Sequence, residues 1–197
     1  MQQRGVDRRR AILDAAGELF GRQGYRGTGL AAIAADAGIT ASAVVHHFGS
    51  KEGLLQAVLD DYDERSASRL AHYVGQGVTG LVDAMLDNAE HMTHNVHLAT
   101  LHTTLQSEHL EAAEDHPVRR RFLDRNRMLR KAIAAIFRTA VADGELASCP
   151  DPEAIATEIL AFQEGALVLW RLDPTVDLHA LYANYFRRLL TDCGAKM

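Results

Sequence analysis

Cysteine and proline are scarce in this sequence, and signals for extended strands are missing. Its 197 residues include two cysteines, Cys149 and Cys193, and four prolines. Two isolated thiols indicate a reducing compartment and exclude a disulfide-stapled scaffold. No segment shows the alternation of apolar and polar residues with tight-turn pairs that is typical of strands. Abundant alanine and leucine favour helix, so we expect an all-α fold.

Long apolar runs are also missing. No stretch approaches the roughly 18–20 apolar residues that a membrane span needs, and the N-terminal residues MQQRGVDRRR precede no apolar run typical of a signal peptide. We therefore expect a cytoplasmic protein without a membrane partner. The Gly-x-Ser-x-Gly, P-loop and zincin motifs of common enzyme classes are absent as well. Since no other nucleophile or metal constellation replaces them, we expect neither an enzymatic activity nor a cofactor.

The net charge of −5 is unevenly distributed. Residues 1–55 carry seven Lys/Arg against five Asp/Glu, and the remaining residues carry 14 against 21. A mildly basic N-terminal part on an acidic remainder suits a local surface for a polyanion. Segregation of this size is common by chance, so the charge alone does not identify the partner.

Helical periodicity punctuated by Gly, Pro and capping residues predicts about nine helices. The expected ranges are 7–23, 29–37, 41–48, 51–73, 80–95, 97–111, 117–142, 152–172 and 176–191. Thr28, Thr40 and Ser50 are expected to cap helix starts. Gly24 is expected to end the first helix, and Pro152 to occupy a first helical position.

Residues 28–48 carry the pattern of a helix-turn-helix. Two short helices cross steeply only where the side chains at the crossing are small, and Ala34 and Ala37 meet that condition. Gly38 permits the turn between them, and Val44 is placed to join a core shared with the first helix. The outer face of the second short helix is then free to enter a DNA major groove.

The flanks of this segment resemble the DNA-binding domain of the TetR family. The resemblance covers about residues 8–58 and rests on the runs AILDAAGELF (11–20), GYRGT (24–28), IA (33–34), AGIT (37–40) and HFGSKEGLL (47–55). Weaker similarity follows at DGEL (143–146), DPE (151–153), GALVLW (165–170) and DP (173–174). The resemblance to the TetR family implies an all-α homodimer in which the last two helices of each chain pair across the two-fold axis. The implied domains are a helix-turn-helix DNA-binding domain at 1–55 and a helical ligand-binding and dimerisation domain at 56–197.

The resemblance also implies which residues contact operator DNA. The side chains expected nearest to base edges are those of Thr40, Ala41, Ser42, Ala43 and His46. Hydroxyl and imidazole groups can exchange hydrogen bonds with bases, and alanine methyl groups suit thymine. Thr28, His47 and Lys51 are expected to contact phosphates, Thr28 and Lys51 because each starts a helix. Simple capping is the alternative for Thr40, and tight packing against the groove is the alternative for the two alanines.

Val45 departs from the family pattern, which has tyrosine at this position in most members. The tyrosine hydroxyl holds a phosphate, and valine cannot donate, so that contact is lost or moves to His46 or His47. The arginines at 8–10 either add electrostatic affinity or form a solvated basic terminus.

For the helical body, the resemblance implies an apolar cavity that takes an unknown small-molecule effector. The candidate lining residues, each of which also suits a plain core position, are Met85, Leu98, Leu101, His102, Leu105, Phe122, Phe162 and Trp170. Its occupant would shift the spacing of the two DNA-reading heads, and we expect repression that the ligand relieves. The alternative is a helix-turn-helix regulator without a small-molecule ligand, either constitutive or gated by a protein partner.

A cluster of histidines raises the question of a metal site. Its members are His91, His94, His97, His102 and His109. The spacing of His91 and His94 places both on one helix face, which suits metal ligation. The others fall on different faces, and no cysteine or Glu-x-x-His arrangement supports them, so we expect no metal.

Overall fold

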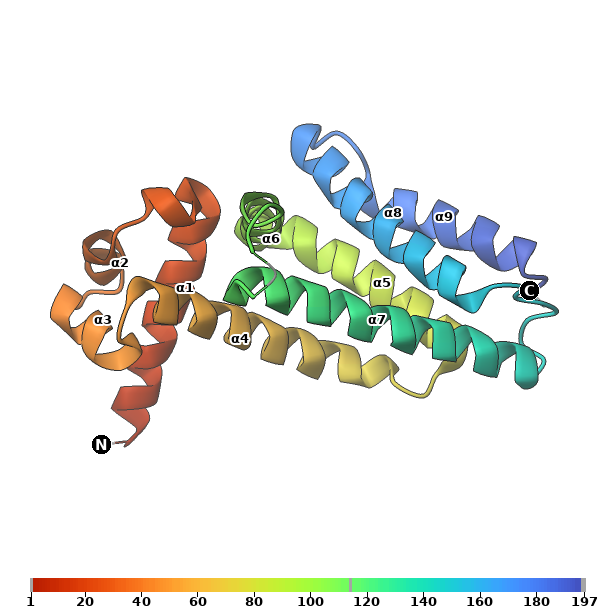
Figure 1. The fold of residues 1–197 in the computed structure, drawn as a ribbon, viewed down its shortest axis with the longest axis horizontal. Helices are drawn as coiled ribbons and strands as arrows, with labels where there is room; N and C mark the ends of the chain where they lie inside the picture. Colours follow the sequence, from red (N-terminus) through yellow and green to blue (C-terminus); the bar gives the residue numbers. More distant parts are fainter. Residues whose placement is uncertain (1, 114, 196–197) are drawn as a thin grey trace. The chain divides into compact units, whose positions relative to one another are not determined.

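A computed structural model describes residues 2–113 and 115–195, with side chains described from residue 7 onward. Within these residues it contains nine α-helices, one short 3-10 helix and no strand (Figure 1). The helices are α1 (Gln2–Gly27), α2 (Leu30–Asp36), α3 (Ala41–Phe48), α4 (Lys51–Leu70), η1 (Ala71–Tyr73), α5 (Gly77–His94), α6 (Val96–Glu108), α7 (Pro117–Ala142), α8 (Pro152–Leu172) and α9 (Leu178–Asp192). The expected all-α fold with about nine helices is confirmed.

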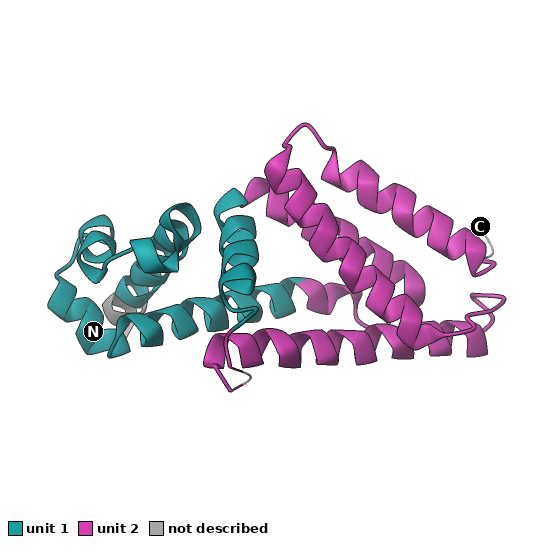
Figure 2. Cartoon of the chain, turned by 45° about the horizontal axis from the view of Figure 1, so that its top comes forward, with its two compact units in different colours: residues 1–69, 96–111 teal, residues 70–95, 112–197 magenta. Residues whose placement is uncertain are grey.

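The chain forms two compact units, which Figure 2 shows in teal and magenta. Unit 1 consists of residues 1–69 and 96–111, and unit 2 of residues 70–95 and 112–197. Unit 1 extends past the expected DNA-binding domain because it includes most of α4 and the whole of α6, which packs on α1. The functional division at residue 55 stays a prediction.

The apolar face of α1 organises unit 1. Ile12, Ala16 and Phe20 follow one another at intervals of four residues, and all three are fully buried. Gly17 lies between them, and a Cβ there would make an ordinary van der Waals contact with a methyl group of Val58 on α4, 3.6 Å away. The regular helix breaks at Gly24, whose φ of 75° favours glycine, so the expected helix end is confirmed.

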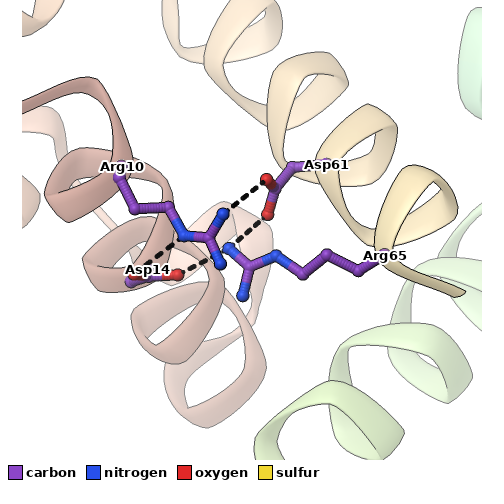
Figure 3. A network of polar contacts seen from close by, with 4 residues as sticks. All are labelled: Arg10, Asp14, Asp61 and Arg65. Carbon is purple, nitrogen blue, oxygen red and sulfur yellow. Dashed lines mark hydrogen bonds and ion pairs between the residues drawn. The ribbon is translucent and has the colours of Figure 1, made fainter. Parts of the chain in front are cut away.

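Four charged side chains connect α1 to α4 on the surface of unit 1 (Figure 3). Arg65 lies 2.8 Å from the carboxylate of Asp14 and 2.5 Å from that of Asp61, and Arg10 reaches the same two carboxylates at 3.4 and 3.6 Å. Three of the four side chains are about half exposed, so each pair contributes only about 0–1 kcal/mol. The network links the two helices specifically, while apolar burial supplies most of their stability.

Helix α6 approaches the backbone of α1 at Gly21. A Cβ at Gly21 would lie 2.3 Å from the carbonyl oxygen of His97 and 3.0 Å from its carbonyl carbon. The obstacle is main chain, which cannot rotate aside as a side chain can. Farther along α6, Leu101 and Leu105 are buried. The contact of α1 with α6 therefore depends on a residue without a side chain.

Aromatic rings join α8 to α9 in unit 2. Phe162 of α8 stacks on Tyr185 of α9 with ring centroids 3.9 Å apart and planes 6° from parallel. Tyr182 meets the same phenylalanine edge-on at 5.1 Å. Burial is the main cause that raises the pKa of both tyrosines. Helix α7 packs on α8, and α5 packs on both α7 and α9.

Two helices of unit 2 begin at residues other than those predicted. Helix α9 begins after Asp177, whose carboxylate accepts a hydrogen bond from the Ala180 N–H at 2.9 Å. Helix α5 begins at Gly77, earlier than the predicted residue 80, and the Val78 N–H donates to the carboxylate of Glu145 at 3.4 Å. A cap from 67 residues away leaves no local signal in the sequence.

Among the described residues, no single helix is both long and apolar enough to cross a membrane. Helices α2 and α3 meet these criteria only when joined, by length and composition alone, and the pair is bent by 104°.

The close contact at Gly21 predicts the effect of one added methyl group. Gly21→Ala should lower the free energy of unfolding by about 1–3 kcal/mol, because the new Cβ overlaps the backbone of α6. Gly27→Ala, at the end of α1 beyond the break at Gly24, is the control, since nothing lies within 4 Å of its Cβ position. It should be neutral or slightly stabilising. Urea denaturation at fixed protein concentration measures both, and equal midpoints for the two variants would contradict the contact.

Candidate nucleic-acid interface

Helices α2 and α3 form a steep turn of the helix-turn-helix type. Their axes are bent by 104°, within the range of about 90–120° typical of such motifs. Gly38 makes the turn with a φ of 66°, as predicted. The Ile39 N–H donates to the Ala34 carbonyl at 2.9 Å, which closes the end of α2. Val44 is completely buried, so its expected core position is confirmed.

The start of α3 is capped by Thr40. Its Oγ1 accepts a hydrogen bond from the Ala43 N–H at 3.2 Å and shares a second one with the Ser42 hydroxyl at 3.0 Å. The predicted capping role of Thr40 is confirmed. Both Thr40 and Ser42 are exposed, so these hydroxyls also lie at the surface.

The outward residues of α3 fall into three pairs, each four residues apart and hence aligned along the helix. In helical projection, Ser42 and His46 lie opposite buried Val44. Ala41 and Val45 lie on one flank of that polar pair, and Ala43 and His47 lie on the other. All six are exposed except Ala43, which is half-buried. The reading surface is therefore a polar centre with a small apolar strip along one side.

Helix α4 begins directly against the end of α3. The Ser50 hydroxyl accepts a hydrogen bond from the Gly53 N–H at 3.0 Å, so the predicted cap is confirmed. A Cβ at Gly53 would lie 2.2 Å from the Phe48 carbonyl oxygen. Glycine at this position lets the first turn of α4 approach α3. The N–H groups and dipole of that turn favour an anion, and Lys51 is its first residue.

Lys51 belongs to a small cluster with Tyr25 and Glu52. Its ammonium lies 4.5 Å from the centre of the Tyr25 ring and 3.4 Å from the Arg26 carbonyl oxygen. The Tyr25 hydroxyl donates to the Glu52 carboxylate at 2.9 Å. Burial, followed by that hydrogen bond, raises the pKa of Tyr25 to about 12. The cluster ties the end of α1 to the start of α4, across a sequence distance at which periodicity gives no signal.

Thr28 does not cap α2, so that prediction is wrong. The cap is Gly29, which has no side-chain hydrogen bond to offer. Thr28 is 1% exposed, and its hydroxyl donates to the carbonyls of Leu19 at 3.1 Å and Gly24 at 2.8 Å. It satisfies the end of α1 instead of the start of α2. The phosphate contact expected at Thr28 stays an untested prediction.

Two arginines near the start of α1 have partners on other helices. The Arg9 guanidinium lies 5.5 Å from the centre of the Phe48 ring at the end of α3. Arg10 belongs to the network with Asp14 and Asp61. The sequence predicted a basic terminus here and missed these two contacts.

The eight candidate effector residues fall on both units, and each set is described by itself. On α6 in unit 1, Leu101 and Leu105 are buried and Leu98 and His102 are half-buried. In unit 2, Met85, Phe122 and Phe162 are half-buried, and Phe162 is engaged in the stack on α9. Trp170 is 8% exposed and lines a shallow cavity of about 340 Å³ with Glu90, Thr93, Val176, Asp177, Leu178 and His179. The effector role of these residues stays a prediction.

The histidines at 91–109 also divide between the units. His91 and His94 lie at the end of α5, where His94 Nδ1 is 2.8 Å from the Glu90 carbonyl oxygen. His97 and His102 lie on α6 in unit 1. In the part of the chain that the structure describes, no three His, Cys, Asp or Glu side chains converge as a metal-binding group.

Two family models match the chain in the regions of these features. The model for "Bacterial regulatory proteins, tetR family" matches residues 12–58, and the model for "BetI-type transcriptional repressor, C-terminal" matches residues 102–192. The chain belongs to the TetR family. The resemblance expected from residues 8–58 is thereby confirmed. TetR-family proteins are helix-turn-helix transcriptional regulators, a class distinct from enzymes.

Individual relatives of this TetR-family protein match shorter stretches. RaaS of Mycobacterium tuberculosis, an HTH-type transcriptional regulatory protein, is 59% identical over 51 residues, which are 26% of this chain and 23% of RaaS. The HTH-type transcriptional regulator UidR of Escherichia coli is 33% identical over 94 residues, 48% of this chain and 47% of UidR. The chain thus spans about a quarter to a half of the curated relatives that it matches.

A solved structure matches nearly the whole fold. The transcriptional regulator FadR of Bacillus subtilis, in complex with stearoyl-CoA, has a TM-score of 0.77. It covers 91% of this chain and 96% of its own, at 18% sequence identity. At that identity the likeness shows the shared fold.

The cluster around Tyr25 predicts how stability depends on pH. Tyr25→Phe keeps the ring beneath Lys51 and removes the hydrogen bond to Glu52, so the free energy of unfolding should fall by about 1 kcal/mol at pH 7. Folding raises the Tyr25 pKa from 10.0 to about 12. The difference in the free energy of unfolding between the wild type and Tyr25→Phe should therefore be complete below pH 10 and decline as the pH rises toward 12. Chemical denaturation at pH 7, 9, 10 and 11 tests this, and a difference that grew with pH would contradict it.

Proposed function

We propose that this TetR-family protein is a homodimeric, one-component repressor that binds a near-palindromic operator and is released by a small, largely apolar effector. The observation that carries the proposal is the exposed outer face of α3, presented at 104° to α2. A helix presented in this way fits the major groove of B-DNA. Operator binding places its site of action in the cytoplasm.

The proposed base-reading side chains lie on α3 and its cap: Thr40, Ala41, Ser42, Ala43 and His46. His47 and Lys51 are the proposed phosphate contacts. Lys51 supplies a charge at the first position of α4, where the helix terminus itself favours anions. We leave Thr28 out of the contact surface because its hydroxyl is buried and bound to two carbonyl groups.

Lys51→Met should weaken operator binding roughly 5- to 10-fold and lower the salt slope by about 1 per DNA-reading head, because one phosphate contact is lost. Methionine retains most of the stem that packs near Tyr25. Lys131→Met is the matched control, since Lys131 is an exposed lysine on α7. Fluorescence anisotropy at several salt concentrations, on an operator selected from random duplexes, measures both variants. Equal affinities and slopes would remove Lys51 from the interface.

An exposed apolar stripe on α8 supports the homodimer. It runs along the C-terminal part of the helix through Ala161, Gly165, Val168, Leu169 and Leu172. Val168 is 46% exposed, and nothing lies within 4 Å of the Cβ position at Gly165. Exposed apolar stripes of this kind mark interaction surfaces. A second α8, related by a two-fold axis, presents the same stripe in complementary orientation. We propose that α8 and α9 pair in this way.

Val168→Glu should shift the protein from dimer to monomer, because it places a carboxylate in the apolar contact without a partner. Met128→Glu is the matched control, since Met128 is a 62% exposed apolar residue on α7. Sedimentation velocity at micromolar concentration compares the two. A Val168→Glu protein that stays dimeric would place the dimer contact elsewhere.

The effector is proposed from the half-buried apolar candidates in the body and from the stearoyl-CoA bound to FadR. The alternative, a regulator without a small-molecule ligand, predicts that no small molecule releases the operator DNA. A screen of apolar metabolites and drugs for release of operator DNA separates them. A compound that releases DNA and raises the melting temperature of the free protein supports an effector.

A further inference from the structure

Helix α3 lacks the side chains that usually give DNA sequence specificity. Bidentate recognition of guanine uses Arg or Lys, and that of adenine uses Asn or Gln. The eight residues of α3, ASAVVHHF, include none of these four types. The central pair, Ser42 and His46, offers single hydrogen bonds, and the Thr40 hydroxyl is already engaged in capping. Hydrogen bonds alone therefore give this surface little discrimination between bases.

Val45 stands out on this surface as a large apolar side chain facing outward. It is 44% exposed, whereas its neighbour Val44 is completely buried. Val45 and Ala41 lie four residues apart and form the apolar strip beside Ser42 and His46. The fold gives Val45 no core position to fill. Its exposed surface is therefore open to a partner that covers the strip.

The major groove offers one apolar group on its base edges, the C5-methyl of thymine. We propose that Val45, together with Ala41, reads a thymine in each operator half-site by burying this methyl group. The inference rests on the proposed function, because it names the base that the same surface recognises. Specificity at that base pair then comes from burial of apolar surface, and the hydrogen bonds of Ser42 and His46 act on neighbouring positions.

Replacing thymine by uracil removes the methyl group and leaves the hydrogen-bonding edge unchanged. An operator is first selected from random duplexes with the wild-type protein, and each of its thymines is then replaced by uracil in turn. Affinities are measured for the wild type, for Val45→Ala and for Val96→Ala. Val96 is the matched control because it is a valine of 43% exposure on α6, away from α3.

For the wild type and Val96→Ala, uracil at one position of each half-site should weaken binding about fourfold per half-site, the effect of one buried methyl-sized group. Val45→Ala should bind the thymine operator more weakly by at least a similar factor, and uracil should then weaken its binding less than it weakens the wild type, because only the contact with Ala41 remains. Such a non-additive cycle identifies direct contact between the two groups. Thermal unfolding of Val45→Ala should match the wild type, because the side chain is exposed.

The other outcomes are distinguishable. If no replacement weakens wild-type binding, or if uracil weakens Val45→Ala as much as the wild type, Val45 does not read thymine, and the proposed repressor still stands. If a folded wild-type dimer selects no operator even at low salt, the proposed function itself fails, and this inference fails with it.

Discussion

Helix α1 is the element against which the other parts of unit 1 are positioned, through the apolar residues of its buried face. Ile12, Ala16 and Phe20 supply apolar burial along its length. Gly21 admits the backbone of α6, and the Phe20 ring lies 5.4 Å from that of Tyr25, which connects to α4. Helix α2 packs on α1 and α3 packs on α2. The position of α3 is therefore set by α1 from two directions, through α2 and through α4.

Accurate placement matters here because the side chains of α3 are short. Alanine, serine and valine reach only a few ångströms from the backbone, so they contact a base only when the helix itself comes close. Their advantage is that they lose little rotamer freedom when they are buried. Gly38 permits the turn into α3 with its φ of 66°, and Gly53 permits the close approach of α4 to the end of α3. In the proposed operator complex, the glycines of the motif and the small residues of α3 act together, because both let the helix backbone come close to its neighbours.

The sequence predicted what depends on local patterns. The turn at Gly38 and the caps at Thr40 and Ser50 are determined within a few residues, and all three are as expected. Threonine is a residue type that often caps helices, but the hydroxyl of Thr28 binds carbonyl groups at the end of α1 instead. These hydrogen bonds depend on how α1 bends at Gly24, which periodicity does not describe.

Contacts between residues far apart in the chain could not be predicted either, because local sequence patterns do not describe them. Helical periodicity predicted the helices of the body and their order, yet the placement of α6 with the N-terminal helices depends on a backbone contact at one glycine. The stack of Phe162 on Tyr185 and the Glu145 cap on α5 join residues far apart in the chain. Nothing in the spacing of these residues distinguishes them from other core or surface positions.

The network of Arg10, Asp14, Asp61 and Arg65 reduces the positive charge that the N-terminal arginines present to a partner (Figure 3). Its two arginines and two aspartates have a net charge of zero, so the charge of Arg10 is balanced within the network. Counterion release on binding to DNA depends on the charges that neutralise phosphates. In the proposed operator complex, the ionic contribution of this terminus is therefore smaller than three consecutive arginines suggest. Arg9, which lies over the Phe48 ring at the end of α3, is better placed than Arg10 to supply it.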